Sequence, residues 1–504
     1  MAIRTFSTRH RIARRLARRI ASGPIAAALA LVLAAPALAE PLSEAQRSAI
    51  IADIDARGPA LSRTALDIWN FAEVGFQEER SSALLQAQLR AAGFEVEAGV
   101  AGMPTAFIAR YRQGTGGPVI GIMAEFDALP GLSQQAQPTL AAAPERSSGH
   151  GCGHNLFGAA SVSAAIATRN WMRANNVTGE VRLYGAPAEE GGSGKVFLVR
   201  AGLTADVSAM LHWHPDDRNS AAQNTALANV SGKFRFTGVS AHAAGAPERG
   251  RSALDGVEAL DYMVNMMREH VPQETRIHYV ITSGGSAPNV VPASAEVYYY
   301  VRHPNQRVVV DIMERVQAAA RGAALGTGTN VTFEQVGGTF DLLPNDTLGR
   351  IVDGNLRAVG GPVWGEAERR FIEQITPSFG AGADIPSSDI QPYSSGNINY
   401  GSTDVGDVSY TTPTAGFGVA TWAPGTAAHS WQAVAASGSS IGVRGATVAA
   451  KVLALSAAEL FQSPDALAAA RAELERRRGP DFVYRSLLGD NPPSLNYRRN
   501  PGTR

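Results

Sequence analysis

The sequence predicts an α/β fold interrupted by a smaller α+β insertion. Helical and strand patterns alternate along most of the chain, and three apolar strands end in side chains that bind metals or transfer protons. Near Val230 the pattern changes to strands with one polar face. Because open α/β sheets place their sites at the carboxyl ends of strands, we expect the chemistry to lie where these three strands end.

The first 39 residues are typical of a secretory signal peptide. They carry seven arginines and no acidic residue, followed by an apolar run from Ile25 to Ala35 and the small-residue site Ala37-Leu38-Ala39. The run is too short and too rich in alanine for a comfortable membrane span. We therefore expect an exported, periplasmic protein without stable membrane insertion after cleavage, and the arginine pairs leave both the Sec and the twin-arginine routes open.

The remaining chain is mildly acidic. Without the seven leader arginines, 38 basic residues stand against 45 acidic ones, a formal net charge of −7. This balance argues against a nucleic-acid partner or an anionic membrane surface. About 465 residues are enough for two or three domains. The single cysteine excludes an internal disulfide, so the core must hold the fold.

The first half of the chain contains the candidate site. Residues 43–70 and 81–92 have a helical period. The three strands and the polar residues that follow them are Pro118–Met123 with Glu125 and Asp127, Val181–Pro187 with Glu189 and Glu190, and Val207–Leu211 with His212 and His214. Each strand end is weak evidence alone, but together they indicate one site.

A glycine-rich turn, Gly149–Asn155, lies between the first two of these strands and precedes a helix predicted from Leu156 to Ala174. It holds Cys152 and His154, separated by one residue. A thiolate and an imidazole at this spacing can face one cation if the backbone bends sharply, and glycine permits that bend. The turn therefore predicts a metal site.

The insertion and the later part of the chain complete the organisation. Three strand patterns, at residues 233–236, 277–281 and 296–301, are separated by helical stretches at 254–269 and 308–320. After Asn345 the helix and strand alternation resumes and ends with a helix near residues 439–460. We predict a catalytic domain in two parts, residues 40–228 and 344–480, an inserted domain at 229–343, and a C-terminal tail at 481–504.

These residues carry a resemblance to a known family. The motifs are Asp127-Ala-Leu-Pro130, the Cys152-Gly-His154 turn, Pro187-Ala-Glu189-Glu190-Gly-Gly, His212-x-x-Pro215, the segment around His242, Asn289-Val-Val-Pro292 and the late His429. In this order they resemble the aminoacylase and carboxypeptidase G superfamily of metallohydrolases. The cysteine, where the wider superfamily has a bridging aspartate, is similar to the branch that includes indole-acetyl-amino-acid and p-aminobenzoyl-glutamate hydrolases.

The resemblance implies a central mixed β-sheet flanked by helices and an inserted ferredoxin-like lid or dimerisation domain. It also implies two divalent ions per chain, of zinc, manganese, cobalt or nickel. Five residues would be their ligands: Cys152, His154, Glu190, His212 and His429. His212 is preferred over His214 because of the family's His-x-x-Pro spacing. Asp127 would orient a metal-bound histidine.

Glu189 would then be the general base and acid for a metal-activated water. His242 would bind the carbonyl oxygen of the substrate, and Asn289 and Arg302 its carboxylate end. The implied reaction is cleavage of the amide bond of an N-acyl or aryl-amido amino acid, such as p-aminobenzoyl-glutamate. The lid would make a homodimer, with His242 serving the neighbouring subunit. Glu125 replaces the aspartate usual in this branch, with unknown consequence.

Other functions stay open at this point. Within the superfamily, an aminoacylase or a dipeptidase would use the same residues. A cysteine hydrolase would use Cys152 as nucleophile and keep its activity in chelator. A non-catalytic periplasmic binding protein on the same fold would have no reason to keep Glu189. The acyl group, the amino acid and the metal are not determined by these motifs.

Overall fold

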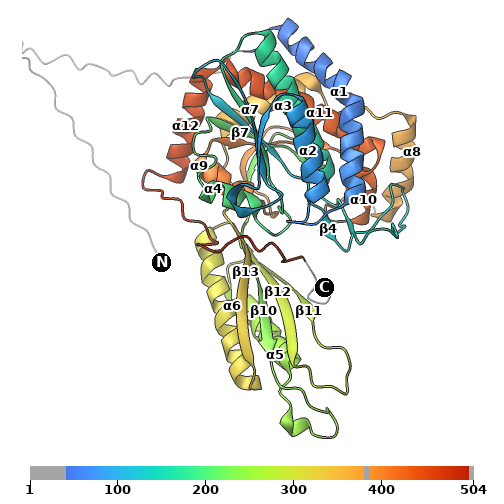
Figure 1. Cartoon of the computed structure of the whole chain (residues 1–504), viewed down its shortest axis with the longest axis vertical. Coiled ribbons are helices and arrows are strands. Elements are labelled where there is room, and N and C mark those ends of the chain that lie inside the picture. The colour runs from blue at the N-terminus through green and yellow to red at the C-terminus, as the bar shows by residue number, and fades with distance from the viewer. Residues whose placement is uncertain (1–40, 380–385, 499–504) are drawn as a thin grey trace, which may run out of the picture. The chain divides into compact units, whose positions relative to one another are not determined.

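The computed structural model describes residues 41–379 and 386–498, so the predicted signal peptide lies outside the described residues. The described chain forms a mixed six-stranded sheet with helices and a separate four-stranded antiparallel sheet (Figure 1). The central sheet has the order β1-β2-β6-β3-β7-β15. Its strands are β1 (Glu95–Ala98), β2 (Phe107–Gln113), β3 (Val119–Ala124), β6 (Gly179–Gly185), β7 (Ala209–Leu211) and β15 (Thr414–Ala415).

The centre of this sheet is parallel and its β1 edge is antiparallel. β3 pairs in parallel with β6 and β7, whereas β2 pairs antiparallel with β1 and β6. All six residues of β3 are buried, as expected for a central parallel strand covered on both faces. β1 has a mostly exposed pattern, because it lies at the edge.

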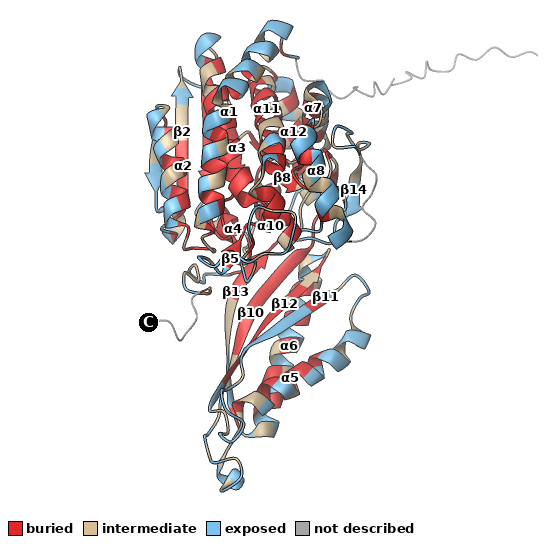
Figure 2. Cartoon of the chain, turned by 90° about the vertical axis from the view of Figure 1, so that its right-hand side faces the viewer, coloured by how far each residue is buried: buried red, intermediate tan, exposed pale blue. Residues whose placement is uncertain are grey.

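Helices of the α/β part flank the sheet, and most of them form one large core with it, while α8 and α10 pack in smaller clusters. They are α1 (Glu44–Phe71), α2 (Glu79–Ala91), α3 (His154–Ala174), α4 (Gly194–Arg200), α7 (Asp346–Val359), α8 (Glu366–Ile375), α9 (Val405–Thr411), α10 (Trp431–Ser437), α11 (Ser440–Phe461) and α12 (Pro464–Arg478). α3 packs on β3 and β6 and is itself covered by α1 and α11. Figure 2 shows α3 and α11 largely buried.

One described helix, α11, is long and apolar enough to cross a membrane, but 72% of its apolar window is buried inside the protein.

Short strand pairs complete this part of the chain. They are β4 (Leu129–Pro130) with β5 (Ser148–Gly149), β8 (His214–Asp216) with β16 (Gly418–Ala420), and β9 (Gln223–Thr225) with β14 (Ser395–Ile398).

The inserted domain, hereafter the lid, has the order of elements βαββαβ. The elements are β10 (Ala228–Thr237), α5 (Ala253–Met267), β11 (Arg276–Ser283), β12 (Ser294–His303), α6 (Gln306–Thr327) and β13 (Asn330–Thr339). The sheet order β11-β12-β10-β13, all antiparallel, is that of a ferredoxin-like fold. The predicted fold class is therefore confirmed, including the mixed central sheet.

The two faces of the lid sheet differ in chemistry. One face carries Phe234, Val297 and Val301, which are buried with α5 and α6 in a second hydrophobic core. The other face carries polar residues: Asn229 lies opposite Arg302, and Lys233 lies opposite Tyr298. Residues directly opposite in an antiparallel pair point to the same side of the sheet. This polar face becomes important below.

Candidate metal centre

The candidate site lies where strands of the central sheet end. Glu125 and Asp127 follow β3, Glu189 and Glu190 follow β6, and His214 begins the short strand after β7. Two further segments join these loops, the turn that starts α3 at His154 and the loop that precedes α10 at Trp431. The parallel strands bring these loops to one edge of the sheet, as the sequence predicted.

Backbone geometry shapes these loops. Gly153 caps α3 with a φ of 72°, and a Cβ there would lie 2.8 Å from Pro215. Ala188, Ser193 and His429 adopt positive φ values although none of them is glycine. Such conformations cost of order 1–3 kcal/mol each and gather at functional sites. The strain therefore points to the same loops as the side chains do.

Two groups of potential ligands share Cys152. The first group is Cys152, Glu190 and His429, and the second is Cys152, His154 and His214. Within each group the ligand atoms lie within 4.8 Å of one another. His429 Nε2 lies 3.0 Å from Cys152 Sγ and 3.3 Å from Glu190 Oε2. A thiolate common to two groups would be available to two cations. A third group, Glu125, His154 and Glu189, shares His154 with the second.

Asp127 orients this site through both of its oxygens. Oδ1 lies 2.9 Å from His154 Nδ1, and Oδ2 accepts the backbone N–H of Glu190 at 2.9 Å. With Nδ1 held by the carboxylate, Nε2 of His154 is the nitrogen left for a metal. One aspartate thus sets the ring orientation of one candidate ligand and the backbone position of another.

The donor set fits divalent cations. Glu190 Oε1 is buried without a hydrogen-bond partner among the described residues, and His154 Nε2 faces Glu125 Oε2 at 3.1 Å without the geometry of a hydrogen bond. A thiol, imidazoles and carboxylates together suit zinc and neighbouring transition metals. The carboxylates also crowd one another, which a cation would relieve.

The crowding is visible in the acid–base properties of the site. Burial and the neighbouring Glu190 and Glu189 raise the pKa of the Cys152 thiol well above its ordinary value. A nucleophilic cysteine needs the opposite shift, which an electropositive surrounding provides. Burial, Glu125 and Glu190 likewise raise the pKa of Glu189, whose Oε2 lies 4.0 Å from His154 Nε2. A carboxyl group of this kind can carry a proton between steps of a reaction.

A buried ion triad that sequence reasoning missed lies beside this cluster. Lys195 Nζ contacts Glu125 Oε1 at 2.6 Å and Asp404 Oδ1 at 2.5 Å. Asp404 also accepts the backbone N–H of Lys195 at 2.8 Å. Glu125 in turn places Oε2 3.1 Å from His154 Nε2. Glu125 therefore connects Lys195 to the cluster of candidate metal ligands.

The structure offers a second candidate ligand beside the predicted His212. The side chain of His212 is half-buried and belongs to none of the three groups of potential ligands, whereas His214 belongs to one of them. Gly416 faces the His212 ring so closely that a Cβ there would lie 2.2 Å from it. His212 lies in the turn between β7, which ends at Leu211, and β8, whereas His214 is the first residue of β8. His214 is therefore an alternative to His212, and the assignment of His212 stays a prediction.

The three predicted substrate-binding residues are separated within one chain. Arg302 pairs with Asn229 near one end of the β10–β12 ladder. At the other end Thr237 pairs with Ser294, and there His242 lies in the segment after β10 and Asn289 in the segment before β12. Eight residues of strand span about 26 Å.

Arg302 lies close enough to His429 for its charge to oppose the rise that Glu190 causes in the pKa of that histidine.

His242 is prepared to donate a hydrogen bond outward. Its Nδ1 accepts the backbone N–H groups of Ala244 and Gly245, at 3.2 and 3.0 Å, so the proton of the neutral ring is on Nε2. Asn289 lies beside it, since its carbonyl accepts the N–H of Ala243 at 3.0 Å.

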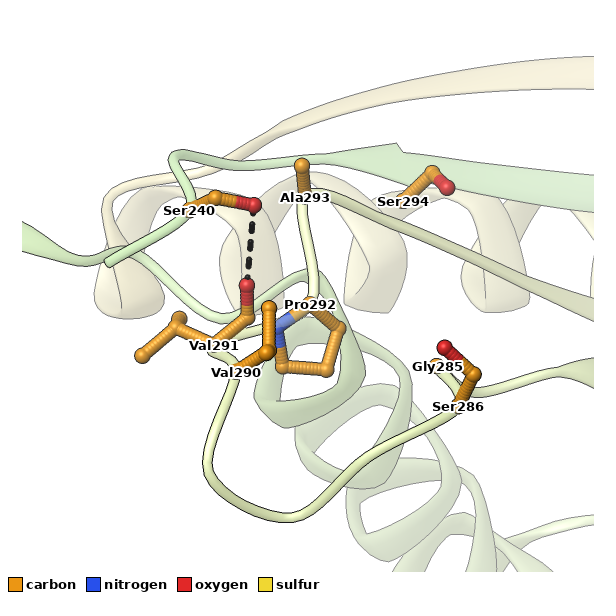
Figure 3. A pocket seen from close by; sticks show the side chains of 8 residues that line it. All are labelled: Ser240, Gly285, Ser286, Val290, Val291, Pro292, Ala293 and Ser294. Atoms are coloured by element: carbon orange, nitrogen blue, oxygen red, sulfur yellow. Dashed lines mark hydrogen bonds between the residues drawn. The ribbon is translucent and has the colours of Figure 1, made fainter. Parts of the chain in front are cut away.

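A pocket next to these loops is lined by Ser240 and residues 285–286 and 290–294 (Figure 3). In it, Ser240 Oγ donates to the carbonyl of Val291 at 3.1 Å. No candidate metal ligand lines this pocket.

Sequence comparisons agree with this architecture. Residues 228–327 match the family model of the peptidase dimerisation domain. The chain is 40% identical over 424 residues to one of the two subunits of p-aminobenzoyl-glutamate hydrolase from Escherichia coli (strain K12), covering 78% of this chain and 87% of that protein. It is 28% identical over 437 residues to Xaa-Arg dipeptidase of Mus musculus, covering 84% and 90%.

Two solved structures share the fold. One is a dinuclear metal-binding peptidase of the M20 family from Bacillus subtilis, with a TM-score of 0.52, 18% identity, and coverage of 81% of this chain and 99% of that one. The other is an aminobenzoyl-glutamate utilization protein from Klebsiella pneumoniae, with a TM-score of 0.50, 18% identity, and coverage of 79% and 96%.

Proposed function

The chain belongs to the M20 family of metal-dependent amidohydrolases and peptidases, and from this premise we propose that it hydrolyses amides of N-acyl or aryl-amido amino acids, with p-aminobenzoyl-glutamate as the first substrate to test. The observation that carries the proposal is the pair of ligand groups sharing Cys152 next to Glu189. The name of the Escherichia coli relative supports the choice of substrate.

The ligand groups assign work to individual residues. Cys152, His154 and His214 would hold one cation, and Cys152, Glu190 and His429 the other. Bound cations lower the pKa of a coordinated water and polarise a carbonyl group. Asp127 keeps His154 Nε2 turned toward the metal by holding Nδ1. Zinc, manganese, cobalt and nickel all suit this donor set.

Glu189 performs the proton transfers. Its carboxylate takes a proton from the attacking water and delivers it to the nitrogen of the leaving amine, a role worth about 10²- to 10⁴-fold in rate. Arg302 binds the carboxylate of the amino acid, for which its guanidinium is suited. The exposed Nε2–H of His242 donates to the carbonyl oxygen as negative charge develops there.

The other function classes are less consistent with the site. Cys152 lies in two groups of potential metal ligands, an arrangement that a cysteine nucleophile does not need. A binding protein would not need Glu189 beside the ligand groups. A dipeptidase of the same family is a second candidate, supported by the similarity to Xaa-Arg dipeptidase.

The lid supports assembly into oligomers, and we infer a homodimer in which His242 serves the partner's metal centre. Support comes from the separation of about 26 Å between the two ends of the lid ladder. The chain is also 24% identical over 331 residues to the other subunit of the Escherichia coli hydrolase, so a second type of subunit is the alternative partner. We further propose export to the periplasm, on the strength of the arginine-rich leader.

The test compares metal content and turnover in two variants. Glu189→Gln is expected to keep about two metal ions per chain and lose at least about a hundredfold in kcat, because it removes only the proton carrier. Cys152→Ala is expected to lose metal as well, since both ligand groups contain it. Metal analysis and amine release from p-aminobenzoyl-glutamate, other N-acyl amino acids and dipeptides provide the readouts. A metal-free protein with full activity would exclude the proposal.

A further inference from the structure

The end of the described chain reaches the candidate site. Residues 487–498, hereafter the strap, cross the end of the lid that adjoins the α/β part (Figure 1). At the end of the strap, Arg498 bonds to the backbone of Glu190. Leu487 packs against the lid core and Leu488 is buried in the main core, so adjacent residues join the two. Ser494 donates to Glu334 of β13 at 2.6 Å, and the carbonyl of Leu495 accepts from Gln77 at 2.9 Å. The strap is thus held by both parts of the fold.

The last two described residues of the strap complete a cluster on the polar face of the lid sheet. The carbonyl of Tyr497 accepts from Lys233 Nζ at 3.0 Å, and its ring is only 5% exposed. Arg498 donates from Nη2 to the backbone carbonyl of Glu190. Its guanidinium lies 4.8 Å from the centre of the Tyr497 ring. The strap therefore places a cation directly beside the loop that carries Glu189 and Glu190.

Two guanidinium groups in this cluster lack an anionic partner. Arg302 lies 5.5 Å from the centre of the Tyr300 ring, and Gly191 lies against both Tyr300 and Arg498. The Nε atoms of Arg302 and Arg498 have no hydrogen-bond partner, and neither group forms an ion pair within residues 41–379 and 386–498. Burial lowers the pKa of Arg498, but Tyr497, Tyr300 and Tyr298 raise it above its ordinary value, so the group stays a cation. Because no carboxylate pairs with this cation among the described residues, it is available to an anion that arrives with a ligand.

We propose that Arg498 is a specificity-determining residue that binds a second carboxylate of the substrate, so that the enzyme prefers amides of dicarboxylic amino acids. This inference rests on the proposed function, in which Arg302 binds the α-carboxylate. One guanidinium suffices for an amino acid with a neutral side chain. The second, delivered by the strap, matches the side-chain carboxylate of glutamate or aspartate in charge and in hydrogen-bonding geometry.

The test uses pairs of substrates that differ in one charge. N-acyl-glutamate and N-acyl-glutamine are nearly equal in size, as are the aspartate and asparagine amides. For the metal-loaded wild type we expect kcat/KM to be at least about tenfold higher for the acidic member of a pair, because a charge-assisted hydrogen bond is lost with the amide. Arg498→Gln should raise KM for the acidic substrate about ten- to hundredfold and leave its kcat within a few-fold. KM for the neutral substrate should hardly change.

Arg485→Gln is the matched control, since Arg485 is an exposed arginine only a few residues before the strap. It should leave both substrates unaffected. Arg498→Lys, which keeps the charge but not the fork, should recover part of the preference and guards against a folding defect in Arg498→Gln. Equal losses on the acidic and neutral substrates would show that the strap is only structural and would overturn the inference.

Binding of free amino acids separates this inference from the proposed function. In titration calorimetry of the metal-loaded wild type, the Kd for L-glutamate should be at least about tenfold lower than the Kd for L-glutamine. Arg498→Gln should make the two Kd values equal. Absence of hydrolysis for every N-acyl amino acid would refute the proposed function, while equal binding of glutamate and glutamine would refute the role of Arg498. A wild type that hydrolyses the neutral amides equally well would also refute the role of Arg498 and leave the proposed function standing.

Discussion

Replacing Lys195 by methionine should destabilise the protein strongly. Lys195 is fully buried, and its partners Glu125 and Asp404 are 2% and 1% exposed. Burial alone would lower the pKa of this lysine, but Asp404 and Glu125 raise it above its ordinary value. A raised folded-state pKa means that the stabilisation is fully present below the unfolded-state pKa of about 10.4 and therefore at neutral pH.

The size of the effect follows from the loss of the counter-ion. Lys195→Met leaves two buried carboxylates facing each other without a cation, and breaking a buried ion pair in this way costs about 3–5 kcal/mol. With an unfolding entropy of about 2.1 cal/mol/K per residue over roughly 465 residues, the expected fall in Tm is about 3–5 °C. Thermal unfolding of the metal-free and metal-loaded forms, followed by calorimetry, measures it.

Lys451→Met is the matched control for this measurement. Lys451 pairs with Asp55, whose side chain is 55% exposed, so we expect a cost of no more than about 1 kcal/mol. In a Glu125→Gln background, Lys195→Met should cost at least about 1 kcal/mol less, because one of the two stranded carboxylates is already neutral. Equal Tm values for the two methionine variants, or strict additivity with Glu125→Gln, would refute the reasoning.

Three further predictions concern ligands, assembly and pH. His214→Ala should lower the metal content to about one ion per chain, whereas His212→Ala should retain two, since only His214 belongs to a ligand group; metal analysis decides, and the reverse pattern would restore the sequence assignment. Subunit exchange between Glu189→Gln and His242→Ala proteins should return about a quarter of the wild-type activity, because half of the dimers are mixed and each has one intact site; inactive verified heterodimers would exclude a role in trans. Burial raises the pKa of Asp407 to about 7, so the folded state binds a proton that the unfolded chain releases near pH 4, and this contribution to stability falls as the pH rises from about 4 to 7. In denaturant titrations, the free energy of unfolding of Asp407→Asn should therefore fall less between about pH 5 and 7.5 than that of the wild type. An equal fall in the two proteins would contradict the raised pKa of Asp407.

The elements of the fold were predictable because their signals are local. The apolar run at β3, the small residues of α3 and the one-sided strands of the lid all follow periodicities that a short window reveals. The same holds for the turn with Cys152 and His154, where the glycines mark a sharp bend. Local patterns indicated the strand-end acids and histidines, while the family resemblance supplied the ligand set and the roles of His242, Asn289, Arg302 and His429.

The sequence by itself thus determined the α/β architecture with its inserted lid and the residue types available to a metal centre. Tertiary structure decided which side chains meet. It brought His429 to Cys152 across 277 positions, joined Lys195 to Asp404 across 209, and placed Arg498 on Glu190 across 308. It also placed His214, and not His212, in a group with Cys152 and His154. The physical reason is that such contacts depend on how distant elements pack and on which buried charges then find partners, and neither property leaves a periodic trace in the chain.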